Sequence, residues 1–158
     1  MNLPNTNSVE LEEIKSHLTN KKGIYFWFDK SENVIVYIGI ATGVGGLKKR
    51  IIQQHLSPKY LEYRAEKHTL KDVFQLKFAI PRVSKKTGDT KYGIDKSAFR
   101  KSIGRLLQLK PGDETVNYIR ANLRLEVYES EDVELIKSME KKLIEKNQPK
   151  FNSTYRKC

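Results

Sequence analysis

The sequence has very little cysteine and no long apolar run. Its only cysteine, Cys158, is the last of 158 residues, so an internal disulfide is excluded and nothing indicates an oxidising compartment. No apolar stretch approaches the roughly 20 residues that a membrane-spanning helix needs, and the N-terminus lacks the pattern of a secretory signal. We therefore expect a cytoplasmic protein that does not enter a membrane.

The chain also lacks internal repeats, low-complexity segments and a recognisable linker. A chain of this length can bury about two thirds of the surface that its unfolded form exposes, so no disulfide or metal is needed for stability. We expect one domain over residues 1–158. The glycines at 43, 45 and 46 are similar to a phosphate-binding loop, but the P-loop ending of Lys followed by Ser or Thr is missing, so a nucleotide site is not expected.

Positive charge is the most prominent feature of the composition. Thirty lysines and arginines face nineteen aspartates and glutamates, which gives a formal net charge of +11. Such a charge on a small protein attracts polyanions, and nucleic acid is the first candidate. A basic but inert surface is the alternative. Binding to a membrane surface would need a basic amphipathic helix with an aromatic face, which the sequence lacks.

Apolar spacing predicts a mixture of strands and helices. Strands are expected at 23–29, 34–39 and 123–128, and helices at about 8–20, 47–56, 97–107, 114–121 and 132–146. The first helix is predicted from the capping-box pattern at residues 7–10, and Asp95 or Ser97 can cap the third. Residues 59–94 have no clear assignment: 72–80 fit a strand or a buried helical turn, and 84–93 resemble a polar loop.

The first two strands each carry a tyrosine beside isoleucine and glycine. They form a predicted hairpin with the triplets Gly23-Ile24-Tyr25 and Tyr37-Ile38-Gly39. Since side chains alternate between the faces of a strand, Tyr25 and Tyr37 can share one face if the register allows.

The last helix contains a carboxylate that does not fit its apolar stripe. The stripe consists of Val133, Ile136, Leu143 and Ile144, and Glu140 lies on it, four residues from Ile136 and from Ile144. Because an unpaired buried charge is costly, Glu140 should meet a cation, a metal ion or a hydrogen-bond donor, or lie where the stripe reaches a cleft. A structural salt bridge or a half-exposed position is the simpler interpretation.

In chain order, these features resemble the GIY-YIG nuclease family. The two tyrosine triplets are followed by Arg50 on the next helix, Glu140 on a late helix and Asn152 near the end. Each triplet is weak alone, but the ordered set is specific. The resemblance is closest over residues 22–56 and 123–152, and the insert at about 57–122 matches poorly.

The resemblance implies a fold and an activity. The fold would be a mixed α+β domain of the α/β class, with a central three-stranded antiparallel sheet flanked by helices. The activity would be hydrolysis of DNA phosphodiester bonds with one divalent metal ion, which agrees with a reaction that needs an activated water and positive charge at the phosphate.

The resemblance also assigns roles to the site residues. Glu140 would hold Mg²⁺ (or Mn²⁺), whose other ligands would be waters and a phosphate oxygen. Arg50 would clamp the phosphate through its planar, permanently charged guanidinium. Tyr25 would be the general base and Tyr37 would position the water or phosphate, although the reverse remains open. Asn152 would order the site by hydrogen bonding; on its own it fits a turn residue equally well.

Some positions depart from the family pattern. Many members have a histidine four residues after the arginine, but Gln54 stands there and His55 comes one residue later, turned by about 100° on a helix. His55 is therefore a weaker catalytic candidate and fits a buried structural role. Lys48 and Lys49 precede Arg50 and are candidates for phosphate contacts, together with that arginine, although first-turn lysines are often only solvated.

The predicted function is thus a metal-dependent endonuclease acting on duplex or branched DNA, with RNA left open as a substrate. A nucleic-acid-binding module of the same fold that has lost cleavage is the alternative, and a basic protein–protein adaptor is the third. The sequence does not indicate the target specificity, the biological role or the oligomeric state.

Overall fold

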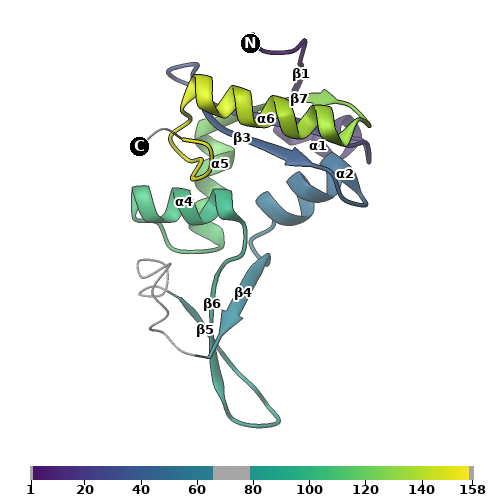
Figure 1. Cartoon of the computed structure of the whole chain (residues 1–158). Helices are drawn as coiled ribbons and strands as arrows, with labels where there is room; N and C mark the ends of the chain where they lie inside the picture. Colours follow the sequence, from purple (N-terminus) through teal and green to yellow (C-terminus); the bar gives the residue numbers. More distant parts are fainter. Residues whose placement is uncertain (1, 66–78, 157–158) are drawn as a thin grey trace. The chain divides into compact units, whose positions relative to one another are not determined.

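The computed structural model describes residues 2–65 and 79–156 (Figure 1). The chain forms two compact units: unit 1 contains residues 1–53 and 119–158, and unit 2 contains residues 54–118. Unit 2 nearly coincides with the insert predicted at about 57–122. The expectation of one domain over the whole chain stays a prediction. Cys158 and positions 72–78 of the ambiguous apolar stretch lie outside the described residues.

Unit 1 is built on the predicted hairpin. Strands β2 (Gly23–Asp29) and β3 (Ile35–Ala41) pair in antiparallel fashion. Their turn is closed by Asp29, whose carboxylate accepts hydrogen bonds from the backbone N–H groups of Ser31 and Glu32, both at 2.9 Å. This is the local hydrogen bonding for which aspartate favours turns. Asn33 completes the turn with a φ of 56°, in the left-handed region that asparagine tolerates.

The predicted α+β class with helices around an antiparallel sheet is confirmed, but the sheet of unit 1 has four strands instead of three. Its order is β1-β7-β2-β3, with β7 (Leu123–Glu129) beside β2 as expected. The extra strand is β1 (Asn7–Val9), which pairs with β7 through Val9 opposite Leu125. A second sheet of three strands lies in unit 2.

The predicted first helix at about 8–20 is therefore wrong at both ends, since only residues 11–17 are helical. After β1 the chain forms a 3-10 turn, η1 (Leu11–Glu13), and a single helical turn, α1 (Ile14–His17). Val9 is β-branched and buries its side chain when β1 pairs with β7. That pairing outweighs the local capping-box signal, because isolated short helices are only marginally stable. Ile14 and Leu18 are nonetheless buried, as the helical pattern required.

The core of unit 1 lies between the sheet and α6 (Val133–Asn147), which runs along β3 in Figure 1. Asp132 caps α6 by accepting a hydrogen bond from the Leu135 N–H at 3.1 Å. The apolar side chains from the two elements pack into one cluster; the sheet contributes Ile24, Phe26, Phe28 and Ile38, and the helix contributes Ile136, Met139, Leu143 and Ile144. The predicted stripe is thus correct for Ile136, Leu143 and Ile144, whereas Val133 is only half-buried and Met139 joins the cluster in addition.

The predicted helix at 47–56 has an unexpected form. It starts as one turn of α-helix, α2 (Gly46–Lys48), and continues as the π-helical segment η2 (Lys49–His55). The wider turn of a π-helix is rare and occurs mostly in short segments near functional sites. Arg50 lies on this segment.

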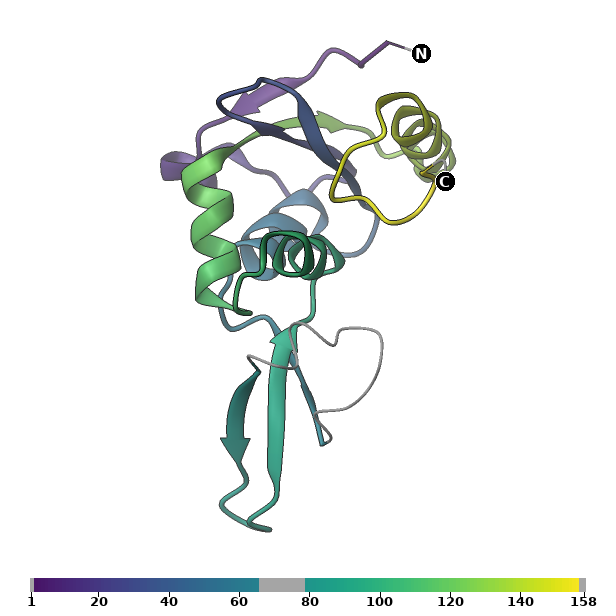
Figure 2. The same cartoon turned by 90° about the vertical axis from the view of Figure 1, so that its left-hand side faces the viewer.

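Unit 2 contains the helices predicted in the middle of the chain and a sheet that the sequence did not reveal. Ser97 caps α4 (Ala98–Leu107) by accepting from the Arg100 N–H at 3.2 Å, and α5 (Asp113–Asn122) follows. The sheet has the order β4-β6-β5, formed by β4 (Leu61–Arg64), β6 (Thr90–Asp95) and β5 (Ile80–Val83) (Figure 2). Residues 90–93, assigned to a polar loop from the sequence, belong to β6.

A buried ion pair organizes unit 2. The carboxylate of Asp95 pairs with the guanidinium of Arg100 and accepts a hydrogen bond from Thr115 Oγ1 at 2.8 Å. Arg100 also donates to the carbonyl oxygens of Ser57 at 2.6 Å and Gln54 at 2.8 Å. Both charged side chains are fully buried, so these partners replace the water that each has lost. The network joins β6, α4, α5, the end of η2 and the residues that follow it.

None of the helices in the described part of the chain is long and apolar enough to cross a membrane.

Candidate active site

The register of the hairpin brings Tyr25 and Tyr37 together on one face of the sheet. Tyr25 lies opposite Gly39 and Trp27 lies opposite Tyr37, so the two tyrosines are diagonal neighbours. Their ring centroids are 6.2 Å apart and the ring planes are inclined by 30°. The predicted shared face is therefore present, while Ile24 and Ile38 of the same triplets point to the core on the other face.

The glycine of each triplet permits a close approach. A Cβ atom on Gly39 would lie 2.3 Å from both Cζ and Oη of Tyr25, so the phenol ring lies directly across the glycine. A Cβ atom on Gly23 would lie 2.3 Å from the backbone oxygen of Tyr128 on the neighbouring strand. A larger residue at either position would displace the strand or the ring.

The two phenols are hydrogen bonded to each other and differ in their surroundings. Burial raises the pKa of Tyr25 well above its usual value, and the hydrogen bond with Tyr37 raises it further. Burial also raises the pKa of Tyr37, to about 12, but there the hydrogen bond lowers the pKa. The hydrogen bond therefore favours the neutral form of Tyr25 and the charged form of Tyr37. Tyr25 is 2% exposed, whereas Tyr37 is partly exposed.

Arg50 and Glu140 act on both phenols. The positive charge of Arg50 lowers the pKa of Tyr25 and of Tyr37, and the negative charge of Glu140 raises both. All four residues belong to unit 1. Unit 1 thus gathers two phenols, a cation and a carboxylate from β2, β3, η2 and α6.

Glu140 lies on α6 beside the buried stripe and is half-buried. Partial burial raises the pKa of its carboxyl to about 6, and the nearby charge of Arg50 opposes this rise. The position matches the sequence expectation of a carboxylate where the stripe reaches the surface. Arg50 itself is exposed, so its guanidinium can reach a bound anion.

Asn152 fastens the end of the described chain to β3. Its side-chain Oδ1 accepts from the Ile38 N–H at 2.9 Å, and its Nδ2 donates to the Ile38 carbonyl at 2.8 Å. The Phe151 N–H donates to the Val36 carbonyl at 2.9 Å. The Asn152 amide therefore pairs with β3 as a neighbouring strand would, and it fixes the backbone of Ile38, the residue next to Tyr37.

Comparison with protein families agrees with this arrangement. A family model described as the GIY-YIG catalytic domain matches residues 5–157. The chain belongs to the GIY-YIG family. Members of this family are nucleases, and they generally use divalent metal ions. Neither a curated protein nor a solved structure matches the chain.

His55, the weakest catalytic candidate of this GIY-YIG protein, is a buried residue of unit 2. Its Nδ1 lies 2.8 Å from Ser97 Oγ, and its ring packs edge-on against Phe99 with a centroid distance of 5.4 Å. It is 3% exposed. These contacts match the structural role that the sequence offered as the alternative.

Lys48 and Lys49 are surface candidates for phosphate contacts, since the first is half-buried and the second exposed. The start of their helix is not an open anion site. The N–H groups of Leu47 and Lys48 donate to the carbonyls of Lys21 at 2.9 Å and Thr19 at 3.0 Å. Gly46 permits this docking, because a Cβ there would lie 2.1 Å from the Asn20 oxygen.

The available side-chain ligands fit a magnesium ion, which also binds water and substrate, better than a metal ion that only protein side chains coordinate. Within residues 2–65 and 79–156, no three side chains of His, Cys, Asp or Glu cluster to hold a metal. Glu140 is a single half-buried carboxylate, and Mg²⁺ commonly uses one or two carboxylates, waters and substrate phosphate oxygens. An ion bound here would therefore depend on the nucleic acid for part of its coordination.

Two features of the GIY-YIG chain escaped the sequence analysis. The first is the close contact of Tyr25 with Gly39, whose signal was the pairing of tyrosine and glycine in the triplets. The second is a basic ribbon in unit 2, residues 80–91, whose signal was the lysines at 85, 86 and 91 inside residues assigned to a loop.

The glycine contact predicts that Gly39→Ala destabilises the protein by about 1–3 kcal/mol, because the new methyl group overlaps the Tyr25 ring. Urea denaturation would measure the change. Gly43→Ala is the matched control, since a Cβ there meets nothing within 4 Å. Equal stability of the two variants would contradict the close packing.

The raised pKa of Glu140 predicts a pH-dependent stability for Glu140→Gln. Its usual pKa is 4.5 and its pKa in the folded protein is about 6, so ionisation weakens folding as the pH rises from 4.5 to 6. The variant should melt at a higher temperature than wild type above that window and at the same temperature below it. Thermal unfolding across pH measures this, with the exposed Glu32→Gln as the control. A variant that is less stable than wild type at pH 8 would refute the buried-charge interpretation.

Proposed function

We propose that this chain is an endonuclease that hydrolyses DNA phosphodiester bonds with the help of a divalent metal ion. The observation that carries the proposal is the convergence of Tyr25, Tyr37, Arg50 and Glu140 in unit 1 of a GIY-YIG chain. Hydrolysis needs a base for the attacking water, positive charge at the phosphate and help for the leaving oxygen. These four side chains offer groups suited to each need.

Glu140 would hold the divalent ion. Mg²⁺ or Mn²⁺, when bound, supplies positive charge that stabilises the leaving oxygen and favours deprotonation of nearby groups. Glu140 contributes the carboxylate, which is ionised above a pH of about 6. Its partial burial limits competition from bulk water for that carboxylate.

Arg50 would bind the non-bridging oxygens of the scissile phosphate. Its guanidinium is exposed, remains charged at any physiological pH and can form two parallel hydrogen bonds to phosphate. The π-helical segment that carries it is short, and the α2 turn directly before it is docked on residues 19–21. Such docking limits the movement of Arg50. Lys49, which is exposed, would add a contact to a neighbouring phosphate.

Tyr37 is the better candidate for the general base, and Tyr25 for its supporting partner. Tyr37 is partly exposed, whereas Tyr25 is buried, so a water molecule can reach Tyr37 more readily. Burial raises the pKa of Tyr37 to about 12, and Arg50 and the hydrogen bond with Tyr25 oppose this rise. A phenolate at Tyr37 would take a proton from the attacking water while Tyr25 donates to its oxygen. Asn152 would hold the β3 backbone next to Tyr37 in place. His55 has no part in this mechanism.

The decisive test is cleavage by Glu140→Gln. The wild type should cut or nick DNA with Mg²⁺ or Mn²⁺, and the variant should be slower by about 100-fold or more, since it loses the ligand for the ion. DNA binding in EDTA should stay close to that of wild type. Glu32→Gln, an exposed carboxylate in the hairpin turn, is the matched control.

Equal cutting by Glu140→Gln and wild type would refute the metal assignment. Binding without cutting by the wild type, with either ion and on duplex, branched and single-stranded DNA or RNA, would instead make the chain a nucleic-acid-binding module.

The assignment of the phenols predicts different pH profiles for two variants. Tyr37→Phe should lose about 10²-fold or more in rate and lose the rise of rate with pH, because it removes the base. Tyr25→Phe should keep the rise but shift it to higher pH, because the hydrogen bond that lowers the pKa of Tyr37 is gone. Initial cleavage rates from pH 6 to 10 measure both. An exchange of the two profiles would make Tyr25 the base.

A further inference from the structure

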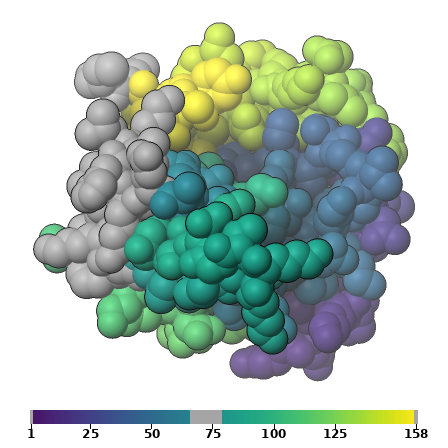
Figure 3. Space-filling model, turned by 90° about the horizontal axis from the view of Figure 1, so that it is seen from below, coloured from purple at the N-terminus to yellow at the C-terminus, as the bar shows by residue number. Residues whose placement is uncertain are grey.

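Unit 2 carries a two-stranded ribbon that buries almost none of its side chains. The basic ribbon, residues 80–91, consists of β5, the turn at 84–89 and the start of β6. Residues 80–89 and Lys91 are exposed, and Val83 is 61% exposed. The ribbon is coloured teal, and part of it is uncovered on the face that Figure 3 shows. Packing against a core therefore does not account for its sequence.

The ribbon nevertheless has a defined shape. Its turn is closed by the Ser84 N–H, which donates to the Asp89 carbonyl at 2.9 Å, and by the Gly88 N–H, which donates to the Ser84 carbonyl at 2.9 Å. Gly88 has a φ of 75°, in the left-handed region that favours glycine. These hydrogen bonds define the backbone from which the charged side chains of the turn extend.

The charges of the ribbon are arranged unfavourably for the protein alone. It carries four cations, Arg82, Lys85, Lys86 and Lys91, and one carboxylate, Asp89. Arg82 and Lys91 are direct partners across the two strands, and like charges in this position repel. Among the described residues, no carboxylate forms an ion pair with any of the four cations. An anion between Arg82 and Lys91 would turn this repulsion into attraction.

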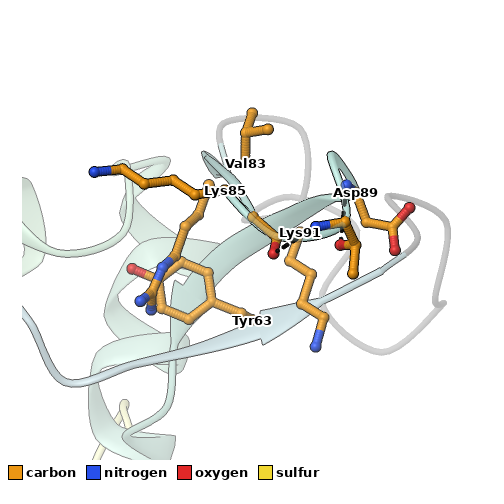
Figure 4. A pocket seen from close by; sticks show the side chains of 8 residues that line it. Tyr63, Val83, Lys85, Asp89 and Lys91 are labelled. Atoms are coloured by element: carbon orange, nitrogen blue, oxygen red, sulfur yellow. Dashed lines mark hydrogen bonds between the residues drawn. The ribbon is translucent and has the colours of Figure 1, made fainter.

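An open pocket adjoins these cations. It has a volume of about 710 Å³ and is lined by Tyr63, Arg82, Lys85, Lys91 and neighbouring residues of the turn. The Arg82 guanidinium lies over the Tyr63 ring at 5.2 Å from its centroid, so the ring orients the guanidinium without neutralising it. Figure 4 shows the side chains of Lys85 and Lys91 extending away from the backbone.

We propose that the basic ribbon is a separate nucleic-acid contact surface that binds the phosphate backbone of a duplex. The partner class rests on the proposed function, but the surface shares no residue with the site in unit 1. A duplex suits the ribbon because a two-stranded ribbon fits into a major groove and reaches phosphates beside it. Arg82 binds phosphate through its fork, and the lysines act as point charges on adjacent phosphates.

The test is the salt dependence of binding by Arg82→Gln/Lys91→Gln. Both this variant and its controls carry Glu140→Gln, and binding to a labelled duplex is followed by fluorescence anisotropy in EDTA, so that cleavage plays no part. Each phosphate contact contributes about 0.9 to the slope of log K against log salt, so losing two should lower the slope by about 1.8. Affinity should fall by about tenfold at low salt. Arg105→Gln/Lys15→Gln, which removes one exposed arginine and one exposed lysine elsewhere, is the matched control and should change the slope little.

A second variant, Lys85→Gln/Lys86→Gln, leaves the contact of Arg82 with Tyr63 intact and should give the same loss. It keeps the test valid if the first variant unfolds the ribbon, which circular dichroism would detect. DNA and RNA duplexes are compared, and an acidic peptide serves as a competitor. Equal slopes for ribbon variants and control would overturn the inference, as would stronger binding of the peptide than of either duplex. If either result is obtained while the wild type still cleaves nucleic acid, the proposed nuclease activity stands and only the basic ribbon loses its assigned role. Failure of the wild type to bind any nucleic acid at low salt would overturn both the nuclease proposal and the ribbon proposal.

Discussion

The contact of the Tyr25 ring with the bare backbone of Gly39 is the constraint on which the site depends. It fixes the register of β2 against β3, and a slip by one residue would turn every side chain of the hairpin to the opposite face. With this register, the tyrosines share one face and the isoleucines of the same triplets join the core on the other. The catalytic candidates and the hydrophobic core are therefore set by the same pairing.

The site of unit 1 places polar groups where they are costly. Burial raises the pKa of both phenols and of the Glu140 carboxyl, which means that the charged form of each is disfavoured in the folded protein. Arg50 opposes the shift in all three cases. In the proposed mechanism a substrate phosphate would bind the Arg50 guanidinium, so the balance of charge around the phenols would change when nucleic acid and the metal ion bind.

The sequence revealed the parts of the fold that local patterns determine. Alternating side chains and polar turn residues predicted β2 and β3, and a carboxylate on an apolar stripe singled out Glu140. Long-range pairing was not visible: β1 forms because Val9 meets Leu125, which no local signal encodes. The sequence also did not reveal the π-helical turn at Arg50 or the buried pair of Asp95 and Arg100, because both depend on tertiary contacts. Charged residues in a sequence usually indicate exposed positions. Only the tertiary structure shows that Asp95 and Arg100 are buried.

The clamp of Asn152 on Ile38 joins residues 114 positions apart. The hairpin with both tyrosines is synthesised early, whereas Glu140 and Asn152 leave the ribosome more than a hundred residues after Tyr25. A nascent chain that has exposed only the hairpin lacks the Glu140 carboxylate and the hydrogen bonds of Asn152 to β3. The order of synthesis therefore completes the set of Tyr25, Tyr37, Arg50 and Glu140 only after translation has passed Glu140, so a partly made chain would lack the carboxylate to which the proposed function assigns the metal ion.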